Sequence, residues 1–377
     1  MKKILVITNQ RGYNEHRNFL GRETKKYKVY RVRDLNSISF ALFKLIINHS
    51  SKILLQCYSG FSFKKHDLVH LWNGISFRKQ PFVSTLEMPD YMGYKEGSYL
   101  LSLKRCYWKS KYCKKIIFIS DWAQKHTLLA WREYYDDKTY FMIKNKCTIL
   151  HPPQKLPVSI KRKDPVSCIK LLFVGRDFYR KGGLELLYTV NKLTTEKKMP
   201  LELTIISSMS LDDWPINTPK EKHQKALNII KNNKSIFLHD SLPNKEVLFQ
   251  MQNSHILCFP TYLDTYGYVI LEAMAYGTPV IATNQRALTE VINNNTVWLL
   301  NMPLNSLDSI DRSTDNLRLK NHHQLCKLLE ETLTNISQNK EVIDKKSKAC
   351  YDYIKENHNF YTHANKLGTI YKEAITN

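Results

Sequence analysis

The sequence predicts an α/β protein made of two doubly wound domains that face each other. Its 377 residues are enough for two domains of ordinary size, each with its own hydrophobic core. Short apolar runs alternate with helical stretches along the chain, which is typical of parallel βαβ units. The alternation is interrupted by His151, by two prolines and by a polar run that ends at Pro165. We therefore expect one domain before this linker and one after it.

The individual elements follow from the apolar runs and their periodicity. In the first half we expect strands at residues 3–8, 29–32, 53–55, 67–72, 81–85, 115–120 and 147–150, and helices near 15–26, at 40–48, within 97–115 and from 121. In the second half we expect strands at 170–175, 201–207, 235–238, 256–260, 280–283 and 296–300, and helices from 244 and at 267–276, 322–335, 341–357 and 361–375. The domains are expected at residues 1–155 and 156–355, with 356–377 as a C-terminal helix that packs back toward the first domain.

Composition and charge limit the classes of function. Hydrophobic residues make up 43% and charged residues 24% of the chain, as in soluble globular proteins. No apolar run approaches the roughly 20 residues that span a bilayer. The eight cysteines include no CxxC pair, so we expect reduced thiols in a cytoplasmic protein without a zinc site.

The positive charge is concentrated in the first half. Residues 1–155 hold 29 Lys and Arg against 11 Asp and Glu, a net charge of +18, whereas residues 156–377 hold 28 against 23, a net charge of +5. A polyanionic partner is therefore expected at the first domain, and the candidates are an anionic membrane, a phosphorylated acceptor and nucleic acid.

Two carboxylates stand out in the apolar stretch 259–284. Asp264 lies in a loop before the expected helix 267–276, and Glu272 lies inside that helix among apolar neighbours. A buried carboxylate is costly without hydrogen-bond donors, and a helix N-terminus offers the unpaired N–H groups and the partial positive charge that suit phosphate. These features favour a site for a phosphorylated, hydroxyl-rich ligand. A structural alternative, in which Asp264 caps the helix and Glu272 pairs with a basic residue, is equally compatible with the composition.

The same stretch resembles the signature of the retaining, GT-B-fold glycosyltransferases of group 1, often numbered family four. That family carries two acids in E-x-F-G-L-x-x-x-E-A-M-A-x-G-x-P-V-I-A-T, and this chain reads D-T-Y-G-Y-V-I-L-E-A-M-A-Y-G-T-P-V-I-A-T from Asp264. A second match, F-V-G-R-D-F-Y-R-K-G-G from Phe173, is similar to the family's V-G-R…K-G. A third and looser match covers residues 239–256. The resemblance implies the GT-B architecture of two facing Rossmann-like domains, with a nucleotide-sugar site in the second.

The resemblance also implies a role for each matching residue. Arg176 and Lys181 would hold the diphosphate of the donor, which agrees with the strength of guanidinium and ammonium groups as phosphate ligands. Glu272 would accept hydrogen bonds from the ribose hydroxyls. Asp264 would contact the hydroxyls of the donor sugar near the reacting centre.

Four further positions complete the expected site. Gly267 and Tyr268 would offer backbone N–H groups to phosphate or sugar, and Gly12, in the loop after the first strand, stands where the family approaches the diphosphate. Glu87 follows the expected strand 81–85, in the region where the family often has a functional His or acid. We assign Glu87 to catalysis together with Asp264, and the alternative is an ordinary loop carboxylate.

The chain departs from the family pattern at three places. Asp264 is one methylene shorter than the usual Glu. Residues 284–287 replace a segment that is usually rich in glycine, although Glu290 keeps the acid that follows. The loop after the first strand has one glycine, Gly12, where the family often has two.

Sugar transfer from a nucleotide donor must stabilise a leaving diphosphate and an oxocarbenium-like sugar. Arg176, Lys181 and the helix N-terminus near Gly267 would meet the developing negative charge. We therefore expect no cofactor and no metal ion, and the sequence has no DxD motif. The nucleotide sugar is a co-substrate, with a UDP-sugar favoured and a GDP-sugar as the alternative. The resemblance implies that the anomeric configuration is retained, by front-face attack.

Residues 97–115 favour a membrane as the polyanionic partner. They carry six basic residues and no acid, and their aromatic side includes Tyr99, Tyr107 and Trp108. A helix of this kind can lie among the headgroups of an anionic membrane. We therefore expect peripheral association with the cytoplasmic face of the membrane and a lipid-linked or oligosaccharide acceptor, in polysaccharide or glycoconjugate biosynthesis. The alternative is a domain helix with a solvated basic face.

Two other functions compete with sugar transfer. A GT-B-fold sugar-nucleotide epimerase or glycan phosphorylase would keep the fold and change the chemistry. A nucleic-acid-binding protein without catalysis would use the basic first half, but the sequence has no helix-turn-helix, zinc-finger or RNA-recognition signature. The cationic pair and the acidic pair together favour a transferase, and we expect no nucleic-acid partner.

Overall fold

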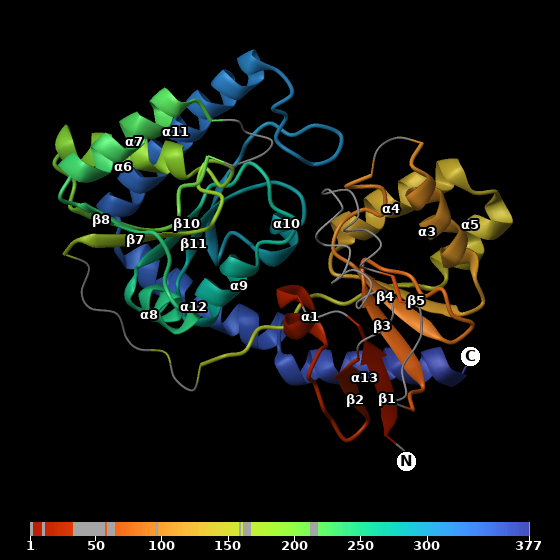
Figure 1. The fold of residues 1–377 in the computed structure, drawn as a ribbon. Helices are drawn as coiled ribbons and strands as arrows, with labels where there is room; N and C mark the ends of the chain where they lie inside the picture. Colours follow the sequence, from red (N-terminus) through yellow and green to blue (C-terminus); the bar gives the residue numbers. More distant parts are fainter. Residues whose placement is uncertain are drawn as a thin grey trace. The chain divides into compact units, whose positions relative to one another are not determined.

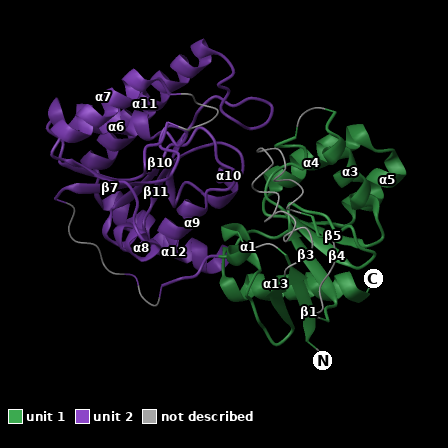
Figure 2. Ribbon diagram, in the orientation of Figure 1, with its two compact units in different colours: residues 1–153, 358–377 green, residues 154–357 purple. Residues whose placement is uncertain are grey.

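The computed structural model describes residues 3–9, 12–32, 57–58, 65–94, 97–157, 160, 167–211 and 218–376. The chain divides into two compact units, the first formed by Met1–Pro153 with His358–Asn377 and the second by Gln154–Asn357 (Figure 2). The divisions fall close to the expected domain boundaries after residues 155 and 355. The helix expected at 40–48 and the strand expected at 53–55 lie outside the described residues.

The first unit contains a parallel sheet in the strand order β2-β1-β3-β4-β5-β6 (Figure 1). Its described strands are β1 (Ile4–Thr8), β2 (Tyr27–Arg31), β3 (Leu68–Trp72), β4 (Phe82–Leu86), β5 (Cys113–Phe118) and β6 (Cys147–Ile149). Its described helices are α1 (Tyr13–Asn18), α3 (Tyr99–Lys109), α4 (Asp121–Tyr134), α5 (Asp137–Lys144) and α13 (Phe360–Thr376). β3 and β4 are buried at every position, as expected for central strands with helices on both faces.

The second unit contains a parallel sheet in the order β12-β11-β10-β7-β8-β9 (Figure 1). Its strands are β7 (Ile169–Val174), β8 (Leu201–Ile206), β9 (Ile236–His239), β10 (Ile256–Phe259), β11 (Val280–Thr283) and β12 (Val297–Leu300). Its described helices are α6 (Gly183–Thr195), α7 (Lys220–Asn232), α8 (Asn244–Asn253), α9 (Tyr268–Ala275), α10 (Leu288–Val291), α11 (Asp315–Gln338) and α12 (Glu341–Asn357). Helices α6, α7 and α11 cover one face of this sheet, and α8, α9 and α12 cover the other. These two doubly wound sheets confirm the fold class that the sequence predicts.

The order of the strands places a switch point in the second sheet. The chain runs outward from β7 through β8 to β9, then returns to the other side of β7 with β10 and runs outward again through β11 to β12. Ligands of doubly wound sheets bind where the direction reverses, beyond the carboxyl ends of the two central strands. The loops after β7 and β10 therefore flank the position where a ligand is expected.

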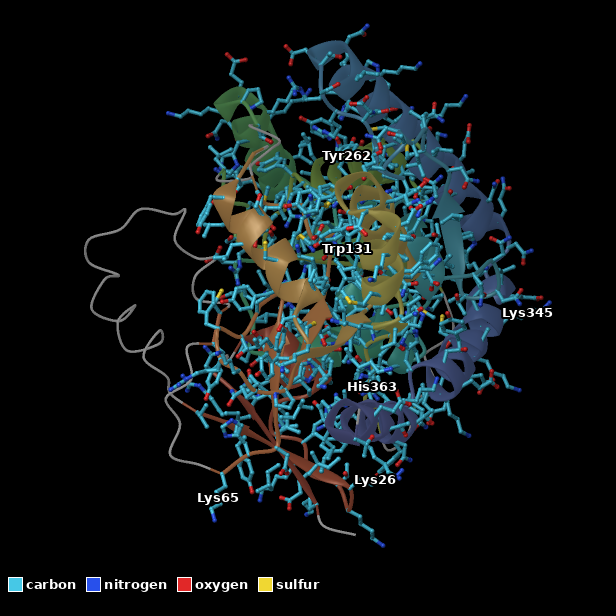
Figure 3. All side chains as sticks on the ribbon, turned by 90° about the vertical axis from the view of Figure 1, so that its right-hand side faces the viewer. Lys26, Lys65, Trp131, Tyr262, Lys345 and His363 are labelled. Carbon is cyan, nitrogen blue, oxygen red and sulfur yellow. The ribbon has the colours of Figure 1, made fainter. Side chains whose placement is uncertain are left out.

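The C-terminal helix α13 belongs to the first unit, where it packs against β3 and β5 (Figure 1). The Tyr371 hydroxyl on α13 lies 2.6 Å from Nδ1 of His70, and Nε2 of the same imidazole lies 2.7 Å from the Thr85 hydroxyl. His363, labelled in Figure 3, lies on the same helix with its Nδ1 2.9 Å from the Arg22 guanidinium. Buried histidines therefore connect the end of the chain to the core of the first unit.

We expect the first unit to lose stability as the pH falls below about 6.5. Burial lowers the pKa of His70 to about 3 and that of His358 to about 4, and it holds the pKa of His363 well below its usual range. These imidazoles stay neutral in the folded protein, whereas in the unfolded chain they take up protons near pH 6.5. The stability is therefore complete above that pH and decreases on acidification. His70 alone should cost about 2 kcal/mol at pH 5 relative to pH 7, at about 1.4 kcal/mol per pH unit.

Urea denaturation between pH 5 and pH 7.5 measures this loss. His70→Gln should flatten the pH dependence, whereas His16→Gln, at an exposed position on α1, should leave it unchanged. Equal pH slopes for the two variants would contradict the assignment.

Candidate functional site

Glycines shape the loop between β7 and α6. Gly182 adopts a left-handed backbone with φ of +71°, and a Cβ there would collide with the carbonyl oxygen of Pro260, at the end of β10. A Cβ on Gly175 would lie 2.5 Å from Cδ of Lys181. The first glycine therefore lets the two loops at the switch point approach each other, and the second leaves room for the lysine side chain to fold back over β7.

Lys181 and Asp264 join these two loops. The Lys181 ammonium lies 3.0 Å from Oδ2 of Asp264, and both side chains are about 15% exposed, at 16% and 15%. The same ammonium lies 4.8 Å from the centre of the Phe259 ring, a cation–π distance. The structure thus brings together two of the residues that the sequence assigned to one site.

Backbone donors complete the surroundings of Asp264. Its Oδ1 accepts hydrogen bonds from the N–H groups of Gly267 at 2.8 Å and Tyr266 at 3.2 Å. Burial opposes ionisation of this carboxyl, but the Lys181 charge and the two N–H groups outweigh it, so the pKa of Asp264 is lowered. Asp264 is therefore a held carboxylate that also organises the turn before α9.

The N-terminus of α9 differs in one respect from the sequence expectation. Gly267 is the residue that precedes the helix, with φ of +79°, and a Cβ there would lie 2.6 Å from a methyl group of Leu288. Its N–H donates to Asp264, so in this structure that group is not directed at a phosphate. The reason is that the Asp264 side chain, three residues earlier in the chain, already accepts the hydrogen bond of the Gly267 amide.

Glu272 lies on the accessible face of α9. Most of this helix is buried, but Tyr268, Val269 and Glu272 are partly exposed. Tyr268 and Glu272 are four residues apart and therefore share one side of the helix. The Glu272 side chain is therefore partly exposed on the same side of α9 as Tyr268, which its apolar sequence neighbours did not indicate.

Arg176 lies two residues after the end of β7 and is exposed. Its guanidinium makes no ion pair or hydrogen bond within the part of the chain that the structure describes. The two cations predicted from the sequence therefore differ in their contacts, since Lys181 forms an ion pair with Asp264 and Arg176 is exposed to solvent.

Arg180 is a residue that the sequence analysis missed. Its guanidinium pairs with Asp177 and donates a hydrogen bond of 2.9 Å to the carbonyl of Leu263. Its own carbonyl accepts the N–H of Tyr262 at 3.0 Å. Arg180 thus fastens the loop after β7 to the loop after β10 through backbone groups. No sequence signal marks an arginine whose partner is a carbonyl 83 residues away.

In the first unit, Glu87 stands at the carboxyl end of β4. Its Oε2 accepts a hydrogen bond of 2.8 Å from the Asn14 side chain, and its N–H donates to Oδ1 of Asn73 at 3.0 Å. Gly12 begins α1, and a Cβ on it would collide with the Glu15 carboxylate. Both predicted residues therefore lie beyond the carboxyl ends of the strands of the first sheet.

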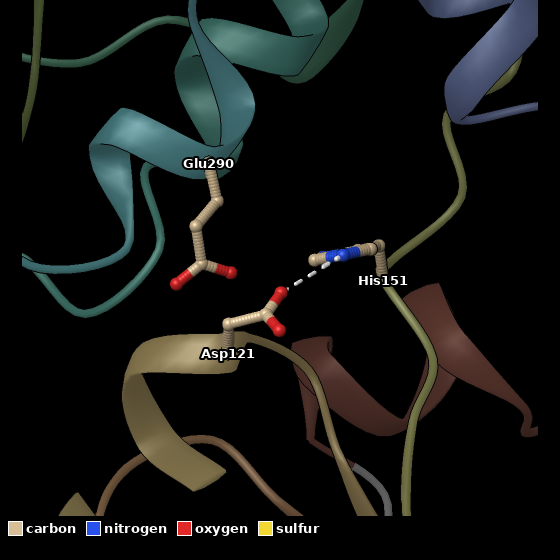
Figure 4. Close-up of side chains that lie close together, drawn as sticks. All are labelled: Asp121, His151 and Glu290. Carbon is tan, nitrogen blue, oxygen red and sulfur yellow. Dashed lines mark ion pairs between the residues drawn. The ribbon is translucent and has the colours of Figure 1, made fainter. Parts of the chain in front are cut away.

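A second polar pair that the sequence analysis did not single out stands at the same edge. His151, just after β6, places Nε2 3.7 Å from Oδ2 of Asp121, the first residue of α4 (Figure 4). Its Nδ1 lies 3.1 Å from the carbonyl oxygen of Ile119. Burial lowers the pKa of His151 despite the neighbouring Asp121 carboxylate, which favours a neutral imidazole at neutral pH.

The helix expected within 97–115 is exposed only in part. Lys104, Arg105 and Trp108 of α3 are buried, with exposed fractions of 6%, 9% and 0%. Arg105 and the Trp131 indole both reach Oδ2 of the buried Asp90, and burial lowers the pKa of Lys104 to about 8. Lys104, Arg105 and Trp108 therefore face the core, whereas Tyr99 at the start of the helix is 77% exposed.

We expect Lys181→Met to destabilise the second unit by about 2–3 kcal/mol at neutral pH, because it leaves Asp264 largely buried without its cation. The deficit should shrink as the pH is lowered toward 4, since the unpaired carboxyl can then bind a proton. Adding Asp264→Asn should restore most of the stability. Lys192→Met removes an exposed ion pair with Glu330 and should cost less than about 1 kcal/mol. Equal losses for the two lysines in urea denaturation would contradict the account of the pair.

Comparisons with known proteins identify the second unit. Residues 160–324 match the family model described as "Glycosyl transferases group 1". An uncharacterized 41.2 kDa protein in the cps region of Klebsiella pneumoniae is 24% identical over 275 residues, which cover 67% of this chain and 70% of that protein. An MMP alpha-(1->4)-mannosyltransferase of Mycolicibacterium hassiacum is 31% identical over 124 residues, which cover 32% of this chain and 27% of the mannosyltransferase.

The fold has counterparts among solved structures. HepE of Anabaena, in complex with UDP and glucose, matches with a TM-score of 0.58 at 11% identity, over 98% of this chain and 99% of HepE. An identity this low shows the fold alone, and that fold is the GT-B arrangement of two Rossmann-like sheets. The segment that matches the family model holds Lys181, Asp264 and Glu272. Residues 160–324 of this chain are therefore similar to the group 1 glycosyl transferases.

Proposed function

We propose that the protein is a retaining glycosyltransferase that moves a sugar from a nucleotide-diphosphate donor to a lipid-linked or glycan acceptor. The observation that carries this proposal is the Lys181–Asp264 pair at the switch point of the second sheet. Arg176 is exposed after β7, and Glu272 lies on the accessible face of α9. Two cations and two carboxylates on these elements suit the phosphates and the hydroxyls of one nucleotide sugar. The complex of HepE with UDP and glucose favours a UDP-sugar over a GDP-sugar.

The chemistry follows from where negative charge develops. When the glycosidic C–O bond to the diphosphate breaks, the leaving oxygen gains charge that Arg176 and Lys181 stabilise. The acceptor hydroxyl attacks the anomeric carbon from the same face, and its proton passes to the leaving phosphate oxygen. Asp264 accepts hydrogen bonds from hydroxyls of the donor sugar, and Glu272 from those of the ribose. This path retains the anomeric configuration, which NMR of the product checks.

We also propose that the reaction needs no divalent metal ion. Arg176, Lys181 and the positive end of α9 supply the charge that a metal would otherwise bring to the diphosphate. Glu87 at the carboxyl end of β4 is assigned to the acceptor side of the reaction, as a group that accepts a hydrogen bond from the incoming hydroxyl.

UDP should bind the wild-type protein, with or without EDTA. Arg176→Ala should weaken binding about tenfold to a hundredfold, since a charge-assisted hydrogen bond contributes about 1.5–3 kcal/mol. The melting temperature of the unliganded variant should not change, because Arg176 is exposed. Isothermal titration calorimetry with UDP, GDP and ADP measures the affinity and the choice of base.

Lys234→Ala is the matched control for this measurement. Lys234 is an exposed cation just before β9, at the opposite edge of the same sheet from Arg176. Absence of binding by every nucleotide diphosphate, or equal affinities of Arg176→Ala and Lys234→Ala with both weakened, would overturn the donor proposal. Tight binding of random-sequence RNA at physiological salt without any nucleotide response would favour the nucleic-acid alternative instead.

For the acceptor, we propose presentation at the anionic cytoplasmic surface of a membrane. Support comes from the net charge of +18 on residues 1–155 and from the exposed cations Lys109 and Lys111 after the exposed Tyr99 of α3. Within the part of the chain that the structure describes, no helix has both the length and the apolar composition that crossing a bilayer requires. Association would therefore be electrostatic and peripheral.

Co-sedimentation with vesicles tests this association. The protein should pellet with vesicles that contain phosphatidylglycerol and not with pure phosphatidylcholine, and the binding should weaken with salt. Lys109→Glu with Lys111→Glu should reduce binding. Lys345→Glu with Lys348→Glu makes the same change of net charge on the exposed side of α12 and should not (Lys345 is labelled in Figure 3). Equal effects of the two pairs would show that only the total charge matters and would contradict a binding surface at α3.

A further inference from the structure

A cavity of about 460 Å³ lies in the second unit where α6, α7 and α11 begin. Leu184 and Glu185 of α6, Lys222 of α7, and Arg318 and Leu319 of α11 are among the residues that line it. Its volume falls within the roughly 300–1,000 Å³ of small-molecule sites. The candidate donor residues Arg176, Lys181 and Asp264 do not line this cavity, so a ligand here would be a second ligand of the unit.

Positive charge converges on this cavity from several elements. The N-termini of three helices, each longer than ten residues, carry partial positive charge at its wall. Lys222, Arg312 and Arg318 add full charges. The acids that face them are Glu185 and Asp315, and Asp315 is already paired with Arg318 at 2.6 Å. The surplus of positive charge suits an anionic group such as a phosphate.

Glu185 adds a hydrogen-bond acceptor to the residues that line the cavity. Its side chain is only 6% exposed, and Oε1 accepts a hydrogen bond of 2.8 Å from the Tyr262 hydroxyl and lies 2.8 Å from Nδ1 of His322. Oε2 is buried and accepts no hydrogen bond from any residue that the structure describes. Buried carboxylate oxygens are normally satisfied, and because Glu185 lines the cavity, a ligand hydroxyl that reaches this oxygen would gain a strong hydrogen bond.

Arg312 shows the same incompleteness on the cationic side. Its guanidinium lies 3.9 Å from the centre of the Tyr262 ring, and its buried Nε finds no acceptor within the described part of the chain. An unpaired carboxylate oxygen and an unpaired guanidinium N–H on residues that line one cavity suit a ligand with both hydroxyl donors and anionic acceptors. A simple anion would leave Glu185 unsatisfied, and a neutral sugar would leave the cations unsatisfied.

We propose that this cavity, the Glu185 pocket, binds a phosphorylated sugar. The phosphate lies against the helix N-termini with Lys222 and Arg318, and the hydroxyls of the sugar bond to Glu185. Leu184 and Leu319 form the apolar sides of the pocket. The ligand is either a free sugar phosphate or a phosphorylated residue at the end of a glycan. The proposal does not depend on the donor site, since none of its residues belongs to the donor machinery.

Isothermal titration calorimetry on the full chain tests the proposal with glucose 6-phosphate, glucose and inorganic phosphate. Glucose 6-phosphate should bind at least about tenfold more tightly than the other two, because only it satisfies both the carboxylate and the cations. Leu319→Trp should abolish this binding by filling the cavity from a residue that is 52% exposed, which the fold tolerates. Methyl α-glucoside 6-phosphate separates the two sources, since a glycan end must be accepted with its anomeric oxygen substituted.

Matched variants make the outcome decisive. Lys222→Ala should weaken glucose 6-phosphate binding about tenfold, whereas Lys231→Ala, an exposed cation in the last turn of the same helix, should not change it. Lys181→Ala should lose UDP binding and keep glucose 6-phosphate binding, and Leu319→Trp should do the reverse. The proposal is overturned if wild type gives no heat, if phosphate alone binds as tightly as glucose 6-phosphate, or if Lys181→Ala removes the glucose 6-phosphate response.

Discussion

The ion pair between Lys181 and Asp264 is the contact on which the second unit's site depends. It joins the loops that follow β7 and β10, the two strands at which the sheet reverses direction. Taking two charges to about 15% exposure is costly, and the cost is offset here by two backbone N–H donors to the carboxylate and by an aromatic ring beside the ammonium. The pair also fixes the start of α9, and with it the side of the helix that presents Glu272.

The two cations of the candidate donor site, Lys181 and Arg176, differ in how firmly their side chains are held. Lys181 is positioned in advance by Asp264 and by the glycine that leaves room for its stem, so little reorganisation is needed to place it. Arg176 is exposed and uncommitted, and its planar fork can bind two phosphate oxygens at once. Under the proposed function, a diphosphate bound between them would meet one fixed charge and one adaptable charge. This division allows strong binding without requiring a strained, fully buried cluster of like charges.

The sequence predicts the parts of this protein that depend on local patterns. Apolar runs mark the strands of both sheets to within a few residues. The resemblance to a family signature pointed to Lys181, Asp264 and Glu272, and the structure brings the first two of them together. The helices α5, α6, α7 and α10 were not predicted from the sequence. The role of Arg180 could not be predicted because its partner is a backbone carbonyl, which has no sequence signature.

The basic stretch at α3 shows a different limit of sequence patterns. Six cations without an acid suggest a solvated surface, yet Lys104 and Arg105 face the core because Asp90, outside the stretch, needs their charge. The composition of residues 97–115 does not include Asp90, the acid that the fold places against Arg105. The same reasoning applies to Glu185. Its apolar sequence neighbours on α6 give no indication of its hydrogen-bond partners, Tyr262 and His322, which come from two other elements.

Tyr262 connects the two polar regions of the second unit. Its hydroxyl donates to Glu185 in the cavity wall, its ring carries Arg312, and its backbone N–H donates to Arg180 beside the Lys181 loop. Two residues further along the chain, Asp264 accepts the ammonium of Lys181. Tyr262 therefore has contacts in both regions of the second unit.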